Sequence, residues 1–100
     1  MRKTFFGSQE SYPISITADG FSMSANEWSV RCIVGAKSTE CPKFSDVGGN
    51  WYFALDTSKL AVGICICVVE YDVPDVNYEG GVRHEVYKEN LVKIESYERV

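Results

Sequence analysis

Four cysteines are the residues of this 100-residue chain with the clearest capacity for chemistry. Cys65 and Cys67 are two positions apart, so on a strand both thiols point the same way, roughly 7 Å from each other. Sulfurs that share a zinc ion at about 2.3 Å each lie closer together, and the spacing of Cys32 and Cys41 matches no zinc motif. With no export signal, a disulfide framework is disfavoured too. The pattern predicts four small, buried hydrophobic side chains.

His84 is the only histidine. A Cys–His nucleophilic pair would require it beside an activated thiol, whereas its neighbours Arg83 and Glu85 indicate a strand position near a sheet edge or an interface. The serine-hydrolase elbow, the phosphate-binding loop and the zinc-protease helix motif are all missing from the sequence. We therefore expect a protein that is not an enzyme and has no catalytic, cofactor-binding or metal-binding residues. A pocket that groups His84 with a cysteine or with paired acids would contradict this expectation.

The segment Asp75-Val76-Asn77-Tyr78-Glu79-Gly80 is similar to the start of a calcium loop, in which alternate oxygens converge on the ion. The twelfth position from Asp75 is Val86 rather than Glu, and strands rather than helices are expected on both sides. The sequence favours an acidic turn that ends in glycine and leaves calcium binding open.

Aromatic side chains are more numerous than one small core requires. Packing within the core explains most of them, and a subset is suited to an interface or to a platform on which sugars stack. The residues concerned are Phe5, Phe6, Tyr12, Phe21, Trp28, Trp51, Tyr52, Phe53, Tyr71, Tyr78 and Tyr87.

Length and charge restrict the class of protein. One hundred residues form a single domain, residues 1–100. The net charge of −4 repels phosphate backbones and argues against nucleic-acid binding. The whole of this charge lies in the second half, and no Lys or Arg occurs between Lys59 and Arg83. We therefore expect an acidic surface at one end of the domain.

The sequence contains no export or membrane signal. After Met1-Arg2-Lys3 only Phe5 and Phe6 precede Gly7, which is too short for the core of a signal peptide. The longest uncharged apolar run, residues 60–69, is about half of a membrane span. We expect a soluble chain made in the cytoplasm with no membrane partner.

Alternation with a period of two predicts strands throughout. The expected strands cover residues 12–17, 28–35, 51–56, 63–73 and 82–94. The strand at 63–73 is apolar on both faces, as in a central strand that is covered on both sides. Residues 37–49 are expected to form a loop with a short edge strand at Pro42.

Turn residues separate these runs at Asp19-Gly20, Gly48-Gly49-Asn50, Pro74-Asp75 and Gly80-Gly81. Asp56-Thr57-Ser58 is suited to capping a single helical turn that ends near Leu60, and Gly63 then begins the next strand. Such a corner carries a chain from one sheet to the other. The predicted fold is all-β, an Ig-like two-sheet antiparallel β-sandwich of about six to seven strands.

The order of these features resembles small β-sandwich proteins of phages and prophages of Bacteroides-type bacteria and, more loosely, the N-terminal domain of phage upper-baseplate proteins. The segments that carry the resemblance are Asp19–Ser24, Trp28–Cys32, Trp51–Leu60, Val62-Gly63, Tyr71–Asp75, Gly80–Val86 and Leu91–Ile94. The resemblance implies a virion structural or accessory protein, such as a head fibre, baseplate or tail component, found in the virion or in the host cytoplasm during assembly. It implies no catalytic residue.

A strand that is apolar on both faces requires a second cover, and in a domain of this size the simplest cover is another protomer. We therefore expect protein partners, including a homo-oligomer, which would be a trimer if it follows the symmetry common in fibres. Residues 82–94 are suited to supplying a pairing edge. The alternative function is a glycan- or ligand-binding β-sandwich module of a gut bacterium.

Overall fold

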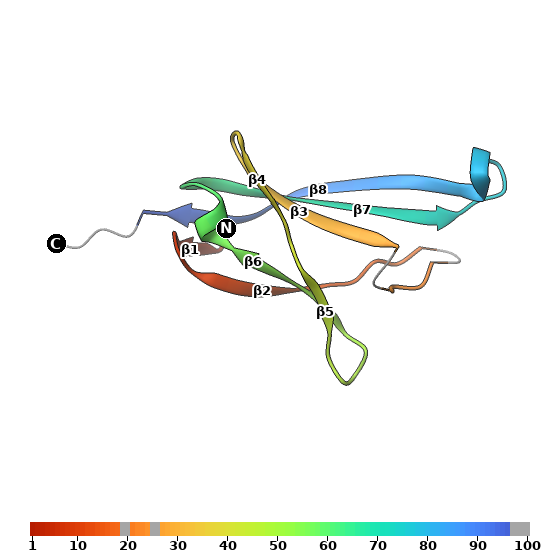
Figure 1. The fold of residues 1–100 in the computed structure, drawn as a ribbon, viewed down its shortest axis with the longest axis horizontal. Helices are drawn as coiled ribbons and strands as arrows, with labels where there is room; N and C mark the ends of the chain where they lie inside the picture. Colours follow the sequence, from red (N-terminus) through yellow and green to blue (C-terminus); the bar gives the residue numbers. More distant parts are fainter. Residues whose placement is uncertain (19–20, 25–26, 97–100) are drawn as a thin grey trace.

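The computed structural model describes residues 1–18, 21–24 and 27–96, so the turn predicted at Asp19-Gly20 lies outside the described residues. The described part consists of strands and two single 3₁₀ turns, which confirms the all-β class (Figure 1). The strands are β1 (Lys3–Phe5), β2 (Gln9–Ile14), β3 (Trp28–Val34), β4 (Lys37–Glu40), β5 (Lys43–Ser45), β6 (Trp51–Asp56), β7 (Gly63–Pro74) and β8 (Val82–Glu95). The turns are η1 (Thr57–Lys59) and η2 (Glu79–Gly81).

The strands form two sheets rather than one. The larger sheet has the order β1-β8-β7-β3-β4 and the smaller one β2-β6-β5. Neither sheet closes on itself or on the other, and the Ig-like topology remains a prediction.

Two details of the predicted sandwich are wrong. The described residues form eight strands rather than six or seven, because residues 37–45 divide around Pro42 into one edge strand for each sheet. The larger sheet is also not wholly antiparallel, since β1 pairs with β8 in parallel. Gly7, with φ of 100°, turns the chain between β1 and β2 and allows β1 to join the opposite sheet from β2.

Alternation does place the core where it was predicted. On β3, Trp28, Val30, Cys32 and Val34 are buried, and Arg31 between them is exposed. Phe53 and Leu55 of β6 face them from the smaller sheet, and Val92 and Ile94 of β8 complete the centre. Burial of these apolar side chains provides the main driving force for stacking the two sheets.

Within the described part of one chain, β7 is covered on both faces only at Val68, and a second cover from another protomer stays a prediction. Ile64 and Ile66 point away from the smaller sheet and are 40% and 37% exposed. Val68, on the same face, is buried, because Arg31 of β3 and Lys88 of β8 stand directly beside it in register. The long alkyl parts of Arg and Lys are suited to covering an apolar neighbour while their charged ends stay in water.

The corner between β6 and β7 forms as predicted. Asp56 Oδ1 accepts a hydrogen bond from the backbone N–H of Ser58 and so caps η1, which is followed by its C-cap residue Leu60. Thr57 is completely buried. Its Oγ1 accepts from Gly7 N at 2.8 Å and donates to the carbonyl of Ser8 at 2.8 Å. One hydroxyl thus joins two of the places where the chain changes sheets.

We expect Thr57→Val to lower the free energy of unfolding by about 1–3 kcal/mol, because it removes the hydroxyl that accepts from the Gly7 N–H and one of the two hydrogen bonds to the Ser8 carbonyl, which keeps the backbone N–H of residue 57. Urea denaturation measures the change. The matched control is Thr57→Ser, which keeps the hydroxyl and loses only one methyl group, about 1 kcal/mol. A Val variant as stable as the Ser variant would contradict this role.

Candidate interaction surface

The β7–β8 hairpin is the longest element of the molecule and reaches the far end of its long axis (Figure 1). Its two strands pair in antiparallel register from Gly63–Ile94 at the base to Pro74–Val82 at the tip. The β-bulge between Cys65 and Ile66 leaves Leu91 as an extra residue on β8. Beyond the bulge most of β8 is exposed, so the hairpin presents a large surface to solvent.

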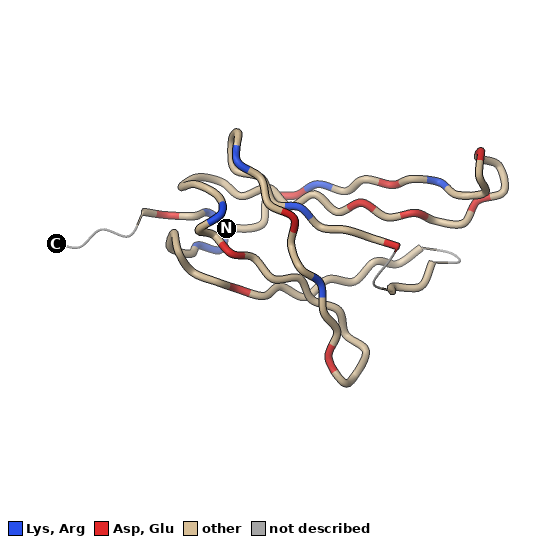
Figure 2. The backbone as a smooth tube through the Cα atoms, viewed as in Figure 1, with Lys and Arg blue, Asp and Glu red and all other residues tan. Residues whose placement is uncertain are grey.

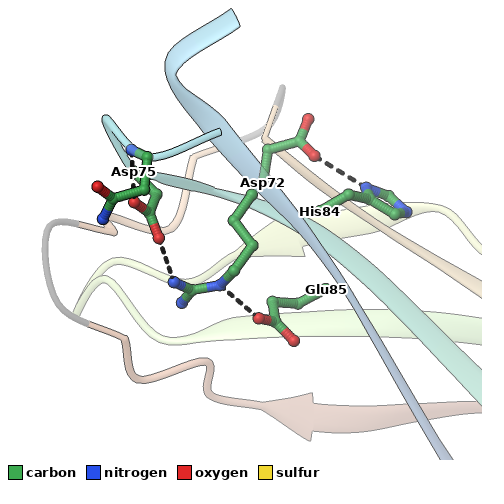
Figure 3. A network of polar contacts seen from close by, with 6 residues as sticks. Asp72, Asp75, His84 and Glu85 are labelled. Carbon is green, nitrogen blue, oxygen red and sulfur yellow. Dashed lines mark hydrogen bonds and ion pairs between the residues drawn. The ribbon is translucent and has the colours of Figure 1, made fainter. Parts of the chain in front are cut away.

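Ion pairs fix the tip of this hairpin. Arg83 donates from Nη1 to Asp75 Oδ2 and from Nε to Glu85 Oε1, both at 2.6 Å (Figure 3). Asp75 also accepts from the backbone N–H of Asn77 through Oδ1. The Asn77 N–H is the main reason why the pKa of Asp75 is lowered, with Arg83 as a further cause. The hydrogen bond to Glu85 is the main reason why the pKa of Arg83 is raised.

His84 lies directly opposite Asp72 in the same hairpin. Its Nδ1 is 2.8 Å from Asp72 Oδ1 (Figure 3). Its Nε2 is 3.7 Å from Glu70 Oε1. The hydrogen bond to Asp72 is the main reason why the pKa of His84 is raised. The predicted position of His84 on a strand is therefore confirmed, with carboxylates rather than a thiol as its partners.

The expected acidic end is partly neutralised. Acids on β7 and in the following turn face bases on β8, so red and blue segments lie side by side along the hairpin (Figure 2). Glu70 and Asp72 face His84, and Asp75 faces Arg83. The sequence shows that Lys and Arg are absent between residues 59 and 83. It does not show that the acids of β7 pair with a strand that carries bases.

The segment similar to a calcium loop forms a turn in which both carboxylate oxygens of Asp75 are occupied by Asn77 and Arg83. Within residues 1–18, 21–24 and 27–96, no group of three acidic, histidine or cysteine side chains is arranged to hold a metal ion. The same residues include no helix that could cross a membrane.

All four cysteines are buried and unbridged, as small hydrophobic side chains would be. They also come together, which the spacing did not predict. Cys32 pairs directly with Cys67 across β3 and β7, and its Sγ is 3.6 Å from that of Cys41. Hydrogen bonds with the neighbouring thiols raise the pKa of Cys32 far above its ordinary value. A thiol held protonated is a poor nucleophile.

The outer edge of β8 is open along most of its length. The pairing with β1 involves only Lys93, Ile94 and Glu95. In the described part of the chain, no strand pairs with that edge between Val82 and Leu91. Open edges of this length present a row of backbone donors and acceptors to any further strand.

Exposed apolar side chains accompany this edge. We call the face of the larger sheet that points away from the smaller one the outer face. On it lie Ile64, Ile66, Val82 and Val86, each between 37% and 48% exposed. They alternate with the polar side chains of Lys88, His84, Glu70 and Asp72. Such a mixture of apolar and charged side chains is typical of the contact surfaces of proteins that are also soluble on their own.

A cavity of about 360 Å³ opens between the two sheets on the opposite face of the hairpin. Ile14, at the end of β2, and Ile16, just beyond it, line one side of the cavity. Tyr71, Tyr87 and Leu91 of the hairpin line the other side. Tyr87 also donates a hydrogen bond to Glu89, a further lining residue, at 2.6 Å. The cavity exists because the smaller sheet is shorter than the hairpin beside it.

The aromatic residues divide between core and surface. Tyr12, Trp28 and Phe53 are buried, and Phe21, Trp51 and Tyr71 pack against the core. Phe5, Phe6, Phe44, Tyr78 and Tyr87 are exposed. Of these, Tyr87 lines the cavity, and Phe44 stacks on Tyr52 with ring centres 5.4 Å apart.

Comparison with known proteins gives no relative: no family model matches this chain, and no curated protein or solved structure matches it. The function must therefore be argued from the surface, the cavity and the resemblance of the sequence.

His84 should make stability depend on pH. Its pKa is raised in the folded state, so the stabilisation is fully present below the unfolded value of about 6.5 and is lost as the pH rises through the folded pKa. We expect the wild type to exceed His84→Gln in stability at acidic pH and the difference to fade above that range. Because the chain has one histidine, an NMR titration reads its pKa directly. Asp72→Asn should lower that pKa, and an unchanged value would contradict the assignment.

Proposed function

We propose that this chain is a non-enzymatic structural or accessory protein that works by assembling with other protein chains, including copies of itself. The observation that carries the proposal is the outer face, where Ile64 and Ile66 of a central strand lie open to solvent. Isoleucine side chains on a strand that pairs on both sides are ordinarily covered, and their exposure here favours a protein contact.

The arrangement of the reactive side chains is consistent with this role. His84 contacts Asp72 and Glu70 near the tip of the hairpin. Asp72, which lies opposite His84, is five positions along β7 from Cys67. The thiols lie in the core, so His84 does not activate one of them. The resemblance of the sequence to phage and prophage sandwich proteins favours a virion, with the chain as part of a head fibre, baseplate or tail.

Incorporation into particles tests the proposal. Phage particles induced from the cells that encode the chain, and purified on a density gradient, should contain it at a stoichiometric level by quantitative mass spectrometry. Ile66→Lys, which places a charge on the outer face, should reduce incorporation at least about tenfold, because burying an unpaired ammonium costs several kcal/mol. The matched control is Val47→Lys, at a fully exposed position in the β5–β6 turn. Particles without the chain, or equal incorporation of both variants, would reject the proposal.

A glycan- or ligand-binding module is the second candidate function, and the cavity beside Tyr71 and Tyr87 favours it. Its volume falls within the range of small-molecule sites, and tyrosine rings are suited to stacking on sugar faces.

For this candidate we expect a glycan array to yield an oligosaccharide that binds, with Tyr87→Ala weakening its affinity about tenfold through loss of ring contact. Tyr78→Ala is the matched control, since Tyr78 is 52% exposed, close to the 53% of Tyr87, and does not line the cavity. Equal effects of the two substitutions would remove this candidate.

A further inference from the structure

We propose that two copies of the chain join through the open edge of β8, with the two strands antiparallel and Val86 of each copy on the two-fold axis. This inference rests on the proposed function, because it specifies how copies of an assembly protein meet. It differs from the trimer expected from fibre symmetry.

The direction of the backbone groups on β8 follows from the hydrogen bonds of β7. Asp72, opposite His84, donates its N–H to the carbonyl of Glu27 on the β3 side. The Asp72–His84 pair is therefore not hydrogen-bonded, and the N–H and C=O of His84 point away from β7. Because this direction alternates along a strand, Val82, Val86, Lys88 and Asn90 also direct their backbone groups outward, toward the open edge.

The limits of the edge select the register. At one end β1 covers β8 from Lys93, whose N–H donates to the carbonyl of Arg2. At the other end β8 begins at Val82. The outward residues run from Val82 to Asn90, and Val86 is their midpoint. Two antiparallel copies centred on Val86 use every outward group and form about ten backbone hydrogen bonds.

The charges favour the same register. Centring on Val86 places Arg83 of each copy opposite Glu89 of the other, and Glu85 opposite Tyr87. Centring on Glu85 would oppose two Glu85 carboxylates, and centring on Tyr87 would oppose Glu85 and Glu89. Opposed like charges on paired strands are destabilising, so these neighbouring registers are disfavoured.

The remaining pairs are compatible with this arrangement. Val86 meets Val86 on the outer face, where it is 48% exposed in one copy. His84 faces Lys88, and the positive charge that His84 gains at acidic pH is offset by Asp72 and Glu70 on its own β7. The result is one continuous sheet across both copies, with their outer faces on the same side.

Sedimentation velocity on the whole chain tests the proposal. The wild type should sediment as a species of twice 11.2 kDa at micromolar concentration. Arg83→Glu and Glu89→Arg should each raise the dimer dissociation constant at least about tenfold, because each variant opposes like charges twice. An equimolar mixture of the two should recover a one-to-one dimer, since every 83–89 pair is then of opposite sign.

Two further variants separate this contact from general effects. Val86→Pro removes an N–H that points away from β7, so the fold should persist, measured by melting temperature, while the dimer is lost. Lys37→Glu changes a charge on β4, at the other edge of the same sheet, and should leave the dimer intact.

Three results would overturn the inference: a trimer, failure of the mixture to pair, or a wild type that is still a monomer at about 100 µM. That concentration is roughly where even weak pairing of strand edges would be visible. Such a result together with normal incorporation into particles would leave the proposed function standing. A dimer that is not found in particles would reject the proposed function alone.

Discussion

The buried hydroxyl of Thr57 is the interaction on which the arrangement of the two sheets depends. It bonds to Gly7 and Ser8 at the turn between β1 and β2, and it belongs to the corner that leads from β6 to β7. The chain changes sheets at both places. A buried polar group is tolerated only when its partners are present, so the hydroxyl holds the two crossings in one relative position. Burial of core residues such as Val30 and Leu55 then drives the stacking of the two sheets in this arrangement.

This arrangement has a consequence for the surface. β1 is short, because the chain turns at Gly7, and it therefore covers only the last residues of β8. The smaller sheet is also short, so it leaves a cavity beneath the hairpin. The open edge and the cavity are thus two results of one feature: a long β7–β8 hairpin beside shorter strands.

Alternating hydrophobicity predicted the strands and their inward faces well, because it reflects which side of a strand meets water. It predicted β3 to within one residue and placed the capped turn at Asp56–Leu60. It failed where pairing partners decide the outcome. The single chain covers one face of β7 but leaves Ile64 and Ile66 exposed on the other, and the acidic end was offset by Arg83 and His84 from the neighbouring strand. The grouping of the cysteines depends likewise on the register of Cys32 with Cys67.

The sequence by itself determined the all-β class, the turns at residues 48–50, 74–75 and 80–81, and the inward or outward direction of most side chains. These properties are local, since they depend on the conformational preferences of neighbouring residues and on a period of two along one strand. Only the tertiary structure decided that β1 pairs in parallel with β8, that the edge from Val82 to Asn90 stays open and that Arg83 lies beside Asp75. These outcomes depend on strand order and register between distant segments, which hydrogen bonds across the sheets fix and no local pattern encodes.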